Sequence, residues 1–202
     1  MESYDKLVHY IKQQLTIKET VIIAIDGRCG SGKSTFASTL ANELNGQIVQ
    51  MDDFFLPVQL RTKERLQQAG ENIHYERFNE EVIIPITRGE DIALQSYDCT
   101  TDSFKELQKL PKKFLFIIEG TYSLYQKIRD IYDVKIFMTV DSSIQVTRIK
   151  ERNGIESLGI FQQKWIPLEE KYFSEYSIEN HCDVTIDTTN GEGIFRKGSK
   201  II

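Results

Sequence analysis

The sequence has few cysteines, no long apolar segment and no excess of positive charge. Its three cysteines are widely spaced and form no CxxC pair, which argues against a disulfide framework and against a zinc site. The longest apolar runs have about five residues, whereas a membrane-spanning helix needs about 20. The first residues lack the basic start and the apolar stretch of a signal peptide. These absences predict a cytoplasmic protein with reduced thiols and no membrane partner.

Positive charge is in the minority, with 25 Lys and Arg against 30 Asp and Glu, a net charge of −5. Proteins that bind nucleic acid without regard to sequence need clustered positive charge, as do polybasic membrane anchors. We therefore expect no nucleic-acid partner. The 202 residues, 40% of them hydrophobic, are enough for one packed α/β domain.

Short apolar runs alternate with segments of helical periodicity. The runs predict buried strands at residues 21–25, 47–51, 114–118, 134–140 and 184–186. The periodicity predicts helices at residues 3–15, 34–44 and 144–152, and a long helix from about 156 to 176. This alternation is typical of a mostly parallel central sheet covered by helices on both faces, a three-layer α/β/α fold.

Three further segments carry local predictions. Residues 92–97 are expected to form another strand, and Pro85 is expected to interrupt a helical turn at residues 82–84. Residues 191–202 contain three glycines and are expected to lie outside the core.

The strongest motif is a phosphate-binding loop at residues 27–34, Gly-Arg-Cys-Gly-Ser-Gly-Lys-Ser, which matches G-x-x-x-x-G-K-[ST] at every fixed position. An apolar strand precedes it and an amphipathic helix follows it, so the motif predicts a P-loop NTPase fold. Lys33 is expected to reach the β- and γ-phosphates, and the Ser34 hydroxyl is expected to ligate Mg²⁺. The expected nucleotide-binding residues are Gly27, Arg28, Cys29, Gly30, Ser31, Gly32, Lys33, Ser34 and Thr35.

Two other interpretations of these glycines are open. One is a glycine-rich turn with a chance lysine. The other is a dinucleotide fingerprint, since Gly30-Ser31-Gly32 begins a G-x-G-x-x-G and Asp52 lies 20 residues after Gly32. The final position of that fingerprint is Thr35 instead of Gly or Ala, and a lysine has no role in it. The phosphate-binding loop is therefore favoured.

Carboxylates follow two of the predicted strands. Asp52 and Asp53 come after residues 47–51, and Glu119 follows residues 114–118. Because the carboxyl ends of parallel strands share one edge of a sheet, we expect these groups beside the phosphate loop. Asp52 is the candidate base for an acceptor hydroxyl, and Glu119 is the candidate metal-site carboxylate. The alternative for all three is a helix cap or a turn.

Basic residues gather on the predicted helix at residues 144–152. Arg148 and Arg152 share one face of it and are candidates to contact the transferring phosphoryl group. Lys164 is a further candidate. Mobile basic helices often supply such charges, so we expect a helical lid at about residues 148–165. A solvated charged helix is the alternative.

These residues together resemble the uridine kinase branch of the P-loop small-molecule kinases, whose relatives include phosphoribulokinase, bacterial pantothenate kinases and nicotinamide riboside kinases. The resemblance covers about residues 21–187. It depends on the phosphate loop, on residues 52–57 (Asp-Asp-Phe-Phe-Leu-Pro), on residues 117–120 (Ile-Ile-Glu-Gly) and on Arg148. The segment from residues 153–154 (Asn-Gly) to residues 165–169 (Trp-Ile-Pro-Leu-Glu) looks like that of bacterial proteins usually called uridine kinase-like.

The resemblance implies a single kinase domain over residues 1–202, with an acceptor-binding insertion at about residues 55–105. It also implies phosphorylation of a hydroxyl on a ribose-like acceptor, with ATP or GTP as the donor. Asp52 matches the base of such kinases, and Glu119 matches the residue near Mg²⁺. Related kinases are often oligomers, so a homo-oligomer is one alternative for this chain.

The acceptor segment departs from the family pattern. Relatives usually hold the ribose hydroxyls with an Asp where this chain has His74, and they read the base with a His shortly after a Tyr, which is absent after Tyr97. The alternative for His74 is a structural role, and the alternative for Tyr97 is packing within a strand. The expected acceptor-binding residues are Asp53, Phe54, His74, Tyr75, Glu76 and Tyr97.

Three functions remain open on the sequence. The first is a kinase for uridine, cytidine or a nucleoside-like molecule. The second is a P-loop kinase for another acceptor, such as pantothenate, nicotinamide riboside or a sugar. The third is a nucleotide-binding module without turnover, which the retained carboxylates disfavour.

Overall fold

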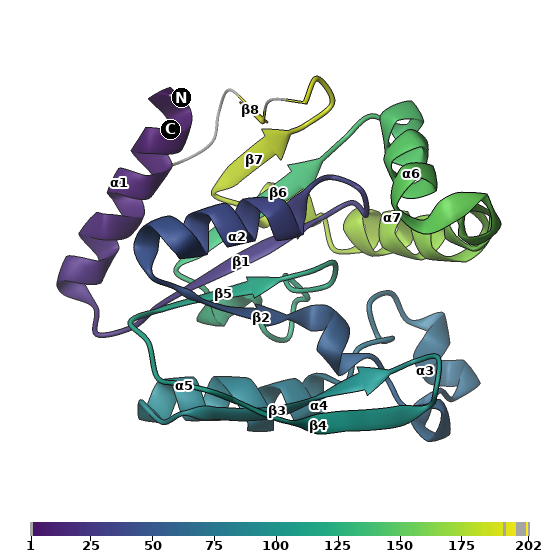
Figure 1. The fold of residues 1–202 in the computed structure, drawn as a ribbon, viewed down its shortest axis with the longest axis horizontal. Coiled ribbons are helices and arrows are strands. Elements are labelled where there is room, and N and C mark those ends of the chain that lie inside the picture. Colours follow the sequence, from purple (N-terminus) through teal and green to yellow (C-terminus); the bar gives the residue numbers. More distant parts are fainter. Residues whose placement is uncertain (1, 192, 197–200, 202) are drawn as a thin grey trace.

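The computed structural model describes residues 2–191, 193–196 and 201 (Figure 1). Its centre is a six-stranded sheet with the strand order β2-β5-β1-β6-β7-β8. These strands are β1 (Val21–Gly27), β2 (Gln47–Gln50), β5 (Leu115–Glu119), β6 (Val134–Thr139), β7 (Val184–Asp187) and β8 (Ile194–Phe195). All neighbours pair in parallel except β8, which is antiparallel to β7. The predicted, mostly parallel sheet is confirmed.

Helices cover both faces of the sheet and complete the three layers (Figure 1). Helices α1 (Glu2–Ile17) and α2 (Lys33–Leu44) pack on one face, where they share a core with Ile23 of β1. The next strand residue, Ala24, belongs to the core on the other face, together with Tyr172 of α7 (Ile166–Glu175). Successive side chains of a strand point to opposite faces, which explains why all of β1 is buried.

A smaller unit lies beside the sheet, between β2 and β5 in the chain (Figure 1). It contains α3 (Lys63–Gln67), α4 (Tyr75–Phe78), α5 (Ile84–Arg88) and an antiparallel hairpin of β3 (Ile92–Asp98) and β4 (Ser103–Leu110). The strand predicted at residues 92–97 is therefore confirmed, although it pairs outside the central sheet. β4 was not foreseen because most of its residues are polar and all of them except Leu110 are exposed, so the sequence has no buried face to reveal it.

Pro85 does not interrupt its helix, so that prediction is wrong. The chain makes a π-helical turn at Asn79–Ile83 and continues directly into α5, with Pro85 in the first turn. The proline is tolerated there because the π turn directly before it already departs from the regular helical hydrogen-bond pattern. The same arrangement recurs at Phe161–Trp165, where Pro167 opens α7.

Helix α6 (Ser142–Ile160) is broken at Gly154, which has φ 82° and ψ 165°. The two helices predicted on either side of residues 153–155 are thus confirmed, and together with the π turn and α7 they form the arm at the right of Figure 1. An added Cβ at Gly154 would meet nothing within 4 Å. The glycine is therefore needed for its backbone conformation and not for lack of space.

The glycine-containing segment at residues 191–202 lies partly within the core, contrary to the prediction. Phe195 of β8 and Ile201 both pack against the core that α1 covers. Residues 192, 197–200 and 202 lie outside the described part of the chain. In that part, no helix is both long and apolar enough to cross a membrane.

Candidate active site

The phosphate loop follows β1 and depends on glycines with positive φ. Gly27 has φ 138°, and a Cβ built there would lie 1.9 Å from the Met138 carbonyl oxygen on β6. Gly30 and Gly32 have φ 74° and 88°, in the left-handed region, and Gly32 caps the start of α2. A side chain at Gly27 would push β6 away from β1, so the loop needs glycine there for packing as well as for conformation.

Lys33 is buried in the first turn of α2. Its Nζ donates to the carbonyl oxygens of Gly27 at 2.8 Å and Arg28 at 2.9 Å. The ammonium group is thus held across the loop by two neutral carbonyls, and its charge also acts on the nearby carboxyls of Asp52 and Glu119. An incoming phosphate can replace the carbonyls as the hydrogen-bond acceptor.

Ser34 and Glu119 meet where α2 begins and β5 ends. The Ser34 hydroxyl donates to Glu119 Oε1 over 3.2 Å. Burial raises the pKa of the Glu119 carboxyl, while the Lys33 charge opposes that shift. No cluster of three His, Cys, Asp or Glu side chains in the described residues could hold a metal alone. One hydroxyl and one carboxylate nevertheless fit Mg²⁺, which takes most of its other ligands from waters and substrate phosphates.

An open cavity of about 760 Å³ joins the phosphate loop to the β3–β4 hairpin and to the lid segment. The sequence-predicted site residues that line it are Cys29, Gly30, Gly32, Lys33, Ser34, Thr35, Asp52, Asp53, Tyr97, Glu119, Arg148 and Arg152. The parallel sheet therefore brings the two strand-end carboxylates to the phosphate loop. One cavity contains groups suited to a nucleotide and groups suited to an acceptor.

Asp52 and Asp53 lie in a 3-10 turn after β2 but differ in environment. Asp53 accepts a hydrogen bond from the Ser96 hydroxyl on β3. No group of the described residues donates a hydrogen bond to Asp52, whose side chain faces the cavity. The surrounding protein raises the pKa of Asp52, while the charges of Lys33 and Arg152 oppose that shift. Asp52 is thus a free carboxylate with a raised pKa.

Four expected acceptor residues do not line this cavity. Phe54 is fully buried, with its ring edge-on to Phe78 at 5.3 Å. Tyr75 is buried too, stacked on Tyr125 at 4.6 Å. His74 caps the start of α4 and pairs with Glu76 over 3.1 Å.

The cause is an isolated antiparallel bridge between Phe55 and Ile73, with His74 N also donating to the Phe54 carbonyl. This pairing turns the segment at residues 72–76 into the small unit and away from the cavity. Phe54, His74, Tyr75 and Glu76 therefore lie outside the cavity that would bind an acceptor.

Two residues of the phosphate loop have side chains that point away from the cavity. Arg28 forms two contacts with Glu170, at 2.7 and 2.9 Å, and donates to the Thr139 hydroxyl. Ser31 is fully buried, and its carbonyl accepts from the Thr188 hydroxyl. The N–H groups of both residues also donate to carbonyl oxygens of the protein, Arg28 N to Met138 at 3.0 Å and Ser31 N to Arg28 at 3.1 Å.

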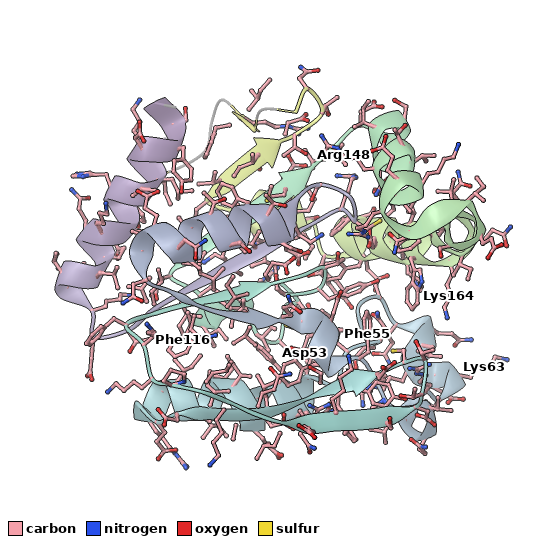
Figure 2. The ribbon with its side chains drawn as sticks, viewed as in Figure 1. Asp53, Phe55, Lys63, Phe116, Arg148 and Lys164 are labelled. Atoms are coloured by element: carbon pink, nitrogen blue, oxygen red, sulfur yellow. The ribbon has the colours of Figure 1, made fainter. Side chains whose placement is uncertain are left out.

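The two predicted lid arginines differ in their surroundings. Arg148 projects from α6 toward the phosphate loop (Figure 2), where it donates to the Gly30 carbonyl at 3.1 Å and the Thr188 carbonyl at 2.6 Å. It ties the loop to the chain after β7. Arg152 lies one turn later, is exposed, and lowers the pKa of Asp52. Both arginines line the cavity, and Arg152 is the one whose charge acts on Asp52.

Two buried carboxylates at the site were missed. Glu169 of α7 accepts from Cys29 N at 3.0 Å and from the Thr121 hydroxyl at 3.4 Å, and burial raises its pKa. Asp26, fully buried at the end of β1, has its pKa raised by burial to about 6. Its donors are Gly27 N, Tyr122 N, Leu124 N and the Tyr172 hydroxyl. Asp26 could have been found because it directly follows the apolar run at residues 21–25. The signal for Glu169 was its spacing from Tyr172, which puts both on one face of a helix.

Comparison with known proteins agrees with this geometry. A sequence model of the Phosphoribulokinase / Uridine kinase family matches residues 22–156. The chain is 27% identical over 151 residues to uridine kinase-like protein 5 of Arabidopsis thaliana. The aligned region covers 69% of this chain and 32% of that protein. It is 28% identical over 150 residues to the uridine kinase of Staphylococcus aureus strain Newman. That aligned region covers 69% of this chain and 72% of that protein. The match thus spans about a third of the plant relative.

Solved structures share the fold. A possible uridine kinase from Bacillus stearothermophilus has a TM-score of 0.63 and 20% identity, over 92% of this chain and 99% of that chain. A putative fructose transport system kinase from Silicibacter sp. TM1040 has a TM-score of 0.60 and 22% identity, over 77% and 85% of the two chains. The likeness confirms the predicted α/β P-loop architecture.

Proposed function

The chain belongs to the phosphoribulokinase/uridine kinase family and is a phosphotransferase that acts on a hydroxyl group, and we propose that it transfers the γ-phosphoryl group of ATP or GTP to a nucleoside such as uridine or cytidine, or to a nucleoside-like small molecule. One observation carries this proposal. The cavity that contains the phosphate loop also contains Asp52, a carboxylate that no described group hydrogen-bonds.

The donor side of the proposed site is built from backbone and cations. The N–H groups of the phosphate loop and the positive end of α2 bind the phosphate oxygens. Lys33, held by two carbonyls, stabilises charge on the β- and γ-phosphates. Arg152 adds a further positive charge from the lid segment, which we propose spans about residues 148–165.

A magnesium ion would be held by the Ser34 hydroxyl and the Glu119 carboxylate, directly or through water. When bound, it supplies charge neutralisation for the phosphates. Ser34 and Glu119 are already in hydrogen-bond contact, so both oxygens are positioned before the nucleotide arrives.

On the acceptor side, Asp52 accepts the proton of the attacking hydroxyl. The hydroxyl oxygen forms a bond to the γ-phosphorus, the bond from that phosphorus to the β–γ bridging oxygen breaks, and the nucleoside diphosphate leaves. A raised pKa brings Asp52 closer to the working pH, where a general base is most effective.

We propose that the segment of about residues 55–105 binds the acceptor, through Asp53 and Tyr97. The Tyr97 hydroxyl donates to Asp102 and accepts from Val58 N, which ties the hairpin to the segment after β2. His74 and Glu76 lie outside the cavity, so the position where relatives hold ribose hydroxyls is not reproduced. That observation favours a second candidate function, a kinase for a different acceptor such as pantothenate, nicotinamide riboside or a sugar.

The test is nucleotide turnover with a panel of nucleosides, vitamins and sugars, followed in wild type and in Asp52→Asn. We expect acceptor-dependent turnover in wild type and a loss of about 10²–10⁴-fold in the variant, with nucleotide binding retained. Glu80→Gln is the matched control, because this exposed carboxylate lies away from the cavity. Failure of every acceptor, or full activity in Asp52→Asn, would contradict the proposal.

A further inference from the structure

A second cavity, of about 650 Å³, adjoins the first one between the α3 segment and the lid segment. Phe55, Cys99 and Trp165 line both cavities. The rings of Phe55 and Trp165 lie 5.9 Å apart and form part of the wall that the cavities share. Lys164 lies on the side of the lid that faces α3 (Figure 2). The two cavities thus adjoin each other at one aromatic pair.

The lining of the second cavity has a distinctive chemistry. Leu66, Pro167 and Leu168 provide apolar surface next to the aromatic pair. Arg61, Lys164 and Lys171 add three positive charges, and none of the lining residues is Asp or Glu. The acidic residues of this chain outnumber its basic residues. The charge of this cavity is therefore opposite in sign to the net charge of the chain.

The three cations are held by neutral groups. Arg61 Nε donates to the Leu56 carbonyl at 2.8 Å, and Lys171 Nζ donates to the Gln67 carbonyl at 2.7 Å. Lys164 Nζ lies 4.6 Å from the centroid of the Trp165 ring. Asp102 interacts electrostatically with Arg61, but it does not line the cavity. The positive charge in the cavity is therefore available to an anion.

We propose that the second cavity binds the far end of the acceptor, and that this end carries a carboxylate or another anionic group on an apolar or aromatic body. The inference rests on the proposed kinase function, since it places the reactive hydroxyl beside Asp52 in the first cavity. An uncharged nucleoside leaves the three cations without a partner. An anionic acceptor fills the cavity and neutralises part of its charge.

Matched acceptors that differ in one charge test this assignment. The pairs are orotidine and uridine, and pantothenate and pantothenol, in each of which one member carries a carboxylate and the other is uncharged. We expect the anionic member of the preferred pair to have a kcat/KM about tenfold or more above its neutral partner, because a charge-assisted contact is stronger than a neutral one.

The double variant Lys164→Gln/Lys171→Gln should raise KM for the anionic member about tenfold more than it raises KM for the neutral member. The control is Lys12→Gln/Lys109→Gln, which removes the same charge from exposed positions outside both cavities. An equal preference within every pair, or an equal effect of the variant on both members, would overturn the assignment.

Calorimetric titration of each pair, with a non-hydrolysable ATP analogue present, separates the two proposals. If nothing is phosphorylated but the anionic member binds more tightly and the lysine variant removes that difference, the kinase proposal fails and the cavity assignment stands. If acceptors are phosphorylated but bind without regard to charge, the assignment fails and the kinase proposal stands. If there is neither turnover nor charge preference, both fail.

Discussion

The Glu169 carboxylate on α7 accepts a hydrogen bond from the backbone N–H of Cys29 in the phosphate loop, over 3.0 Å. From the next turn of the same helix, the Tyr172 hydroxyl donates to Asp26, directly before the loop, at 2.8 Å. Helix α7 therefore braces the first part of the phosphate loop and the residue directly before it. The loop that would bind the nucleotide is held by the helix that follows the lid segment.

Removal of the Glu169 carboxylate should loosen the loop. Glu169→Ala leaves the buried Cys29 N–H without an acceptor, which costs about 1–3 kcal/mol. We expect the KM for the nucleotide to rise about tenfold and the thermal stabilisation by added nucleotide to shrink. Glu169→Gln keeps an acceptor oxygen and should retain most of both. Glu175→Ala, an exposed position on the same helix, is the control; an identical loss in that variant would refute the specific role.

Asp26 should make stability depend on pH in an unusual direction. Its pKa is about 6 in the folded protein against 3.8 ordinarily, because it is fully buried. The folded state therefore holds the proton more tightly than the unfolded state, so the contribution of Asp26 is fully present below about pH 4 and is lost as pH rises through 6. The loss is at most about 3 kcal/mol.

Urea unfolding of wild type and Asp26→Asn at pH 4, 5, 6 and 7 measures this effect. The difference in unfolding free energy between the two proteins should shift against wild type as pH rises from 4 to 6, and then level off. Using the difference removes the contributions of other carboxyls. A difference that stays constant over this range would show that Asp26 does not titrate there.

Gly154 should be required for movement and stability of the lid segment. Its φ of 82° and ψ of 165° lie in a region open almost only to glycine, so Gly154→Ala should cost about 1–3 kcal/mol or straighten the helix. We expect a lower Tm together with a lower kcat.

Gly159→Ala is the matched control for Gly154, because it lies in the same helix without a positive φ and also has nothing within 4 Å of an added Cβ. That substitution should be neutral or stabilise the protein by about 0.5–1 kcal/mol. Thermal unfolding and steady-state kinetics on both variants decide the matter, and equal effects at the two glycines would contradict a hinge at Gly154.

Asp52 should set the acid limb of the pH–rate profile. The base acts only when it is deprotonated, so kcat/KM should fall as pH drops through a pKa that lies above the ordinary 3.8. Arg152 lowers the pKa of Asp52, so Arg152→Gln should move the acid limb to higher pH. Arg88→Gln, exposed and distant from the cavity, should leave the limb in place. If the acid limb stays in place in Arg152→Gln, Arg152 does not influence the titration of the catalytic base.

The parts of this fold that the sequence predicts are those with local signals. The β-branched run before Gly27 predicts a central strand, and a parallel sheet then places Asp52 and Glu119 beside Lys33 without any knowledge of contacts. Burial on both faces forces such strands to be apolar, which is why a simple pattern identifies them.

The parts that could not be predicted depend on contacts between distant residues. Glu169 and Cys29 are separated by 140 positions, and nothing local to either residue indicates their pairing. The same holds for the Phe55–Ile73 bridge. A local comparison of motifs places His74 at the acceptor, but this bridge directs it away from the cavity.

The wall between the two cavities contains a tryptophan whose fluorescence can report on this part of the protein. Trp165 is the single tryptophan of the chain, it belongs to the lid segment, and it touches Phe55 and Lys164. Its intrinsic fluorescence therefore comes from one place only, the boundary that the lid contributes. If the proposed lid opens, the indole separates from Phe55 and becomes exposed to water, so the emission of an unlabelled sample reports that movement.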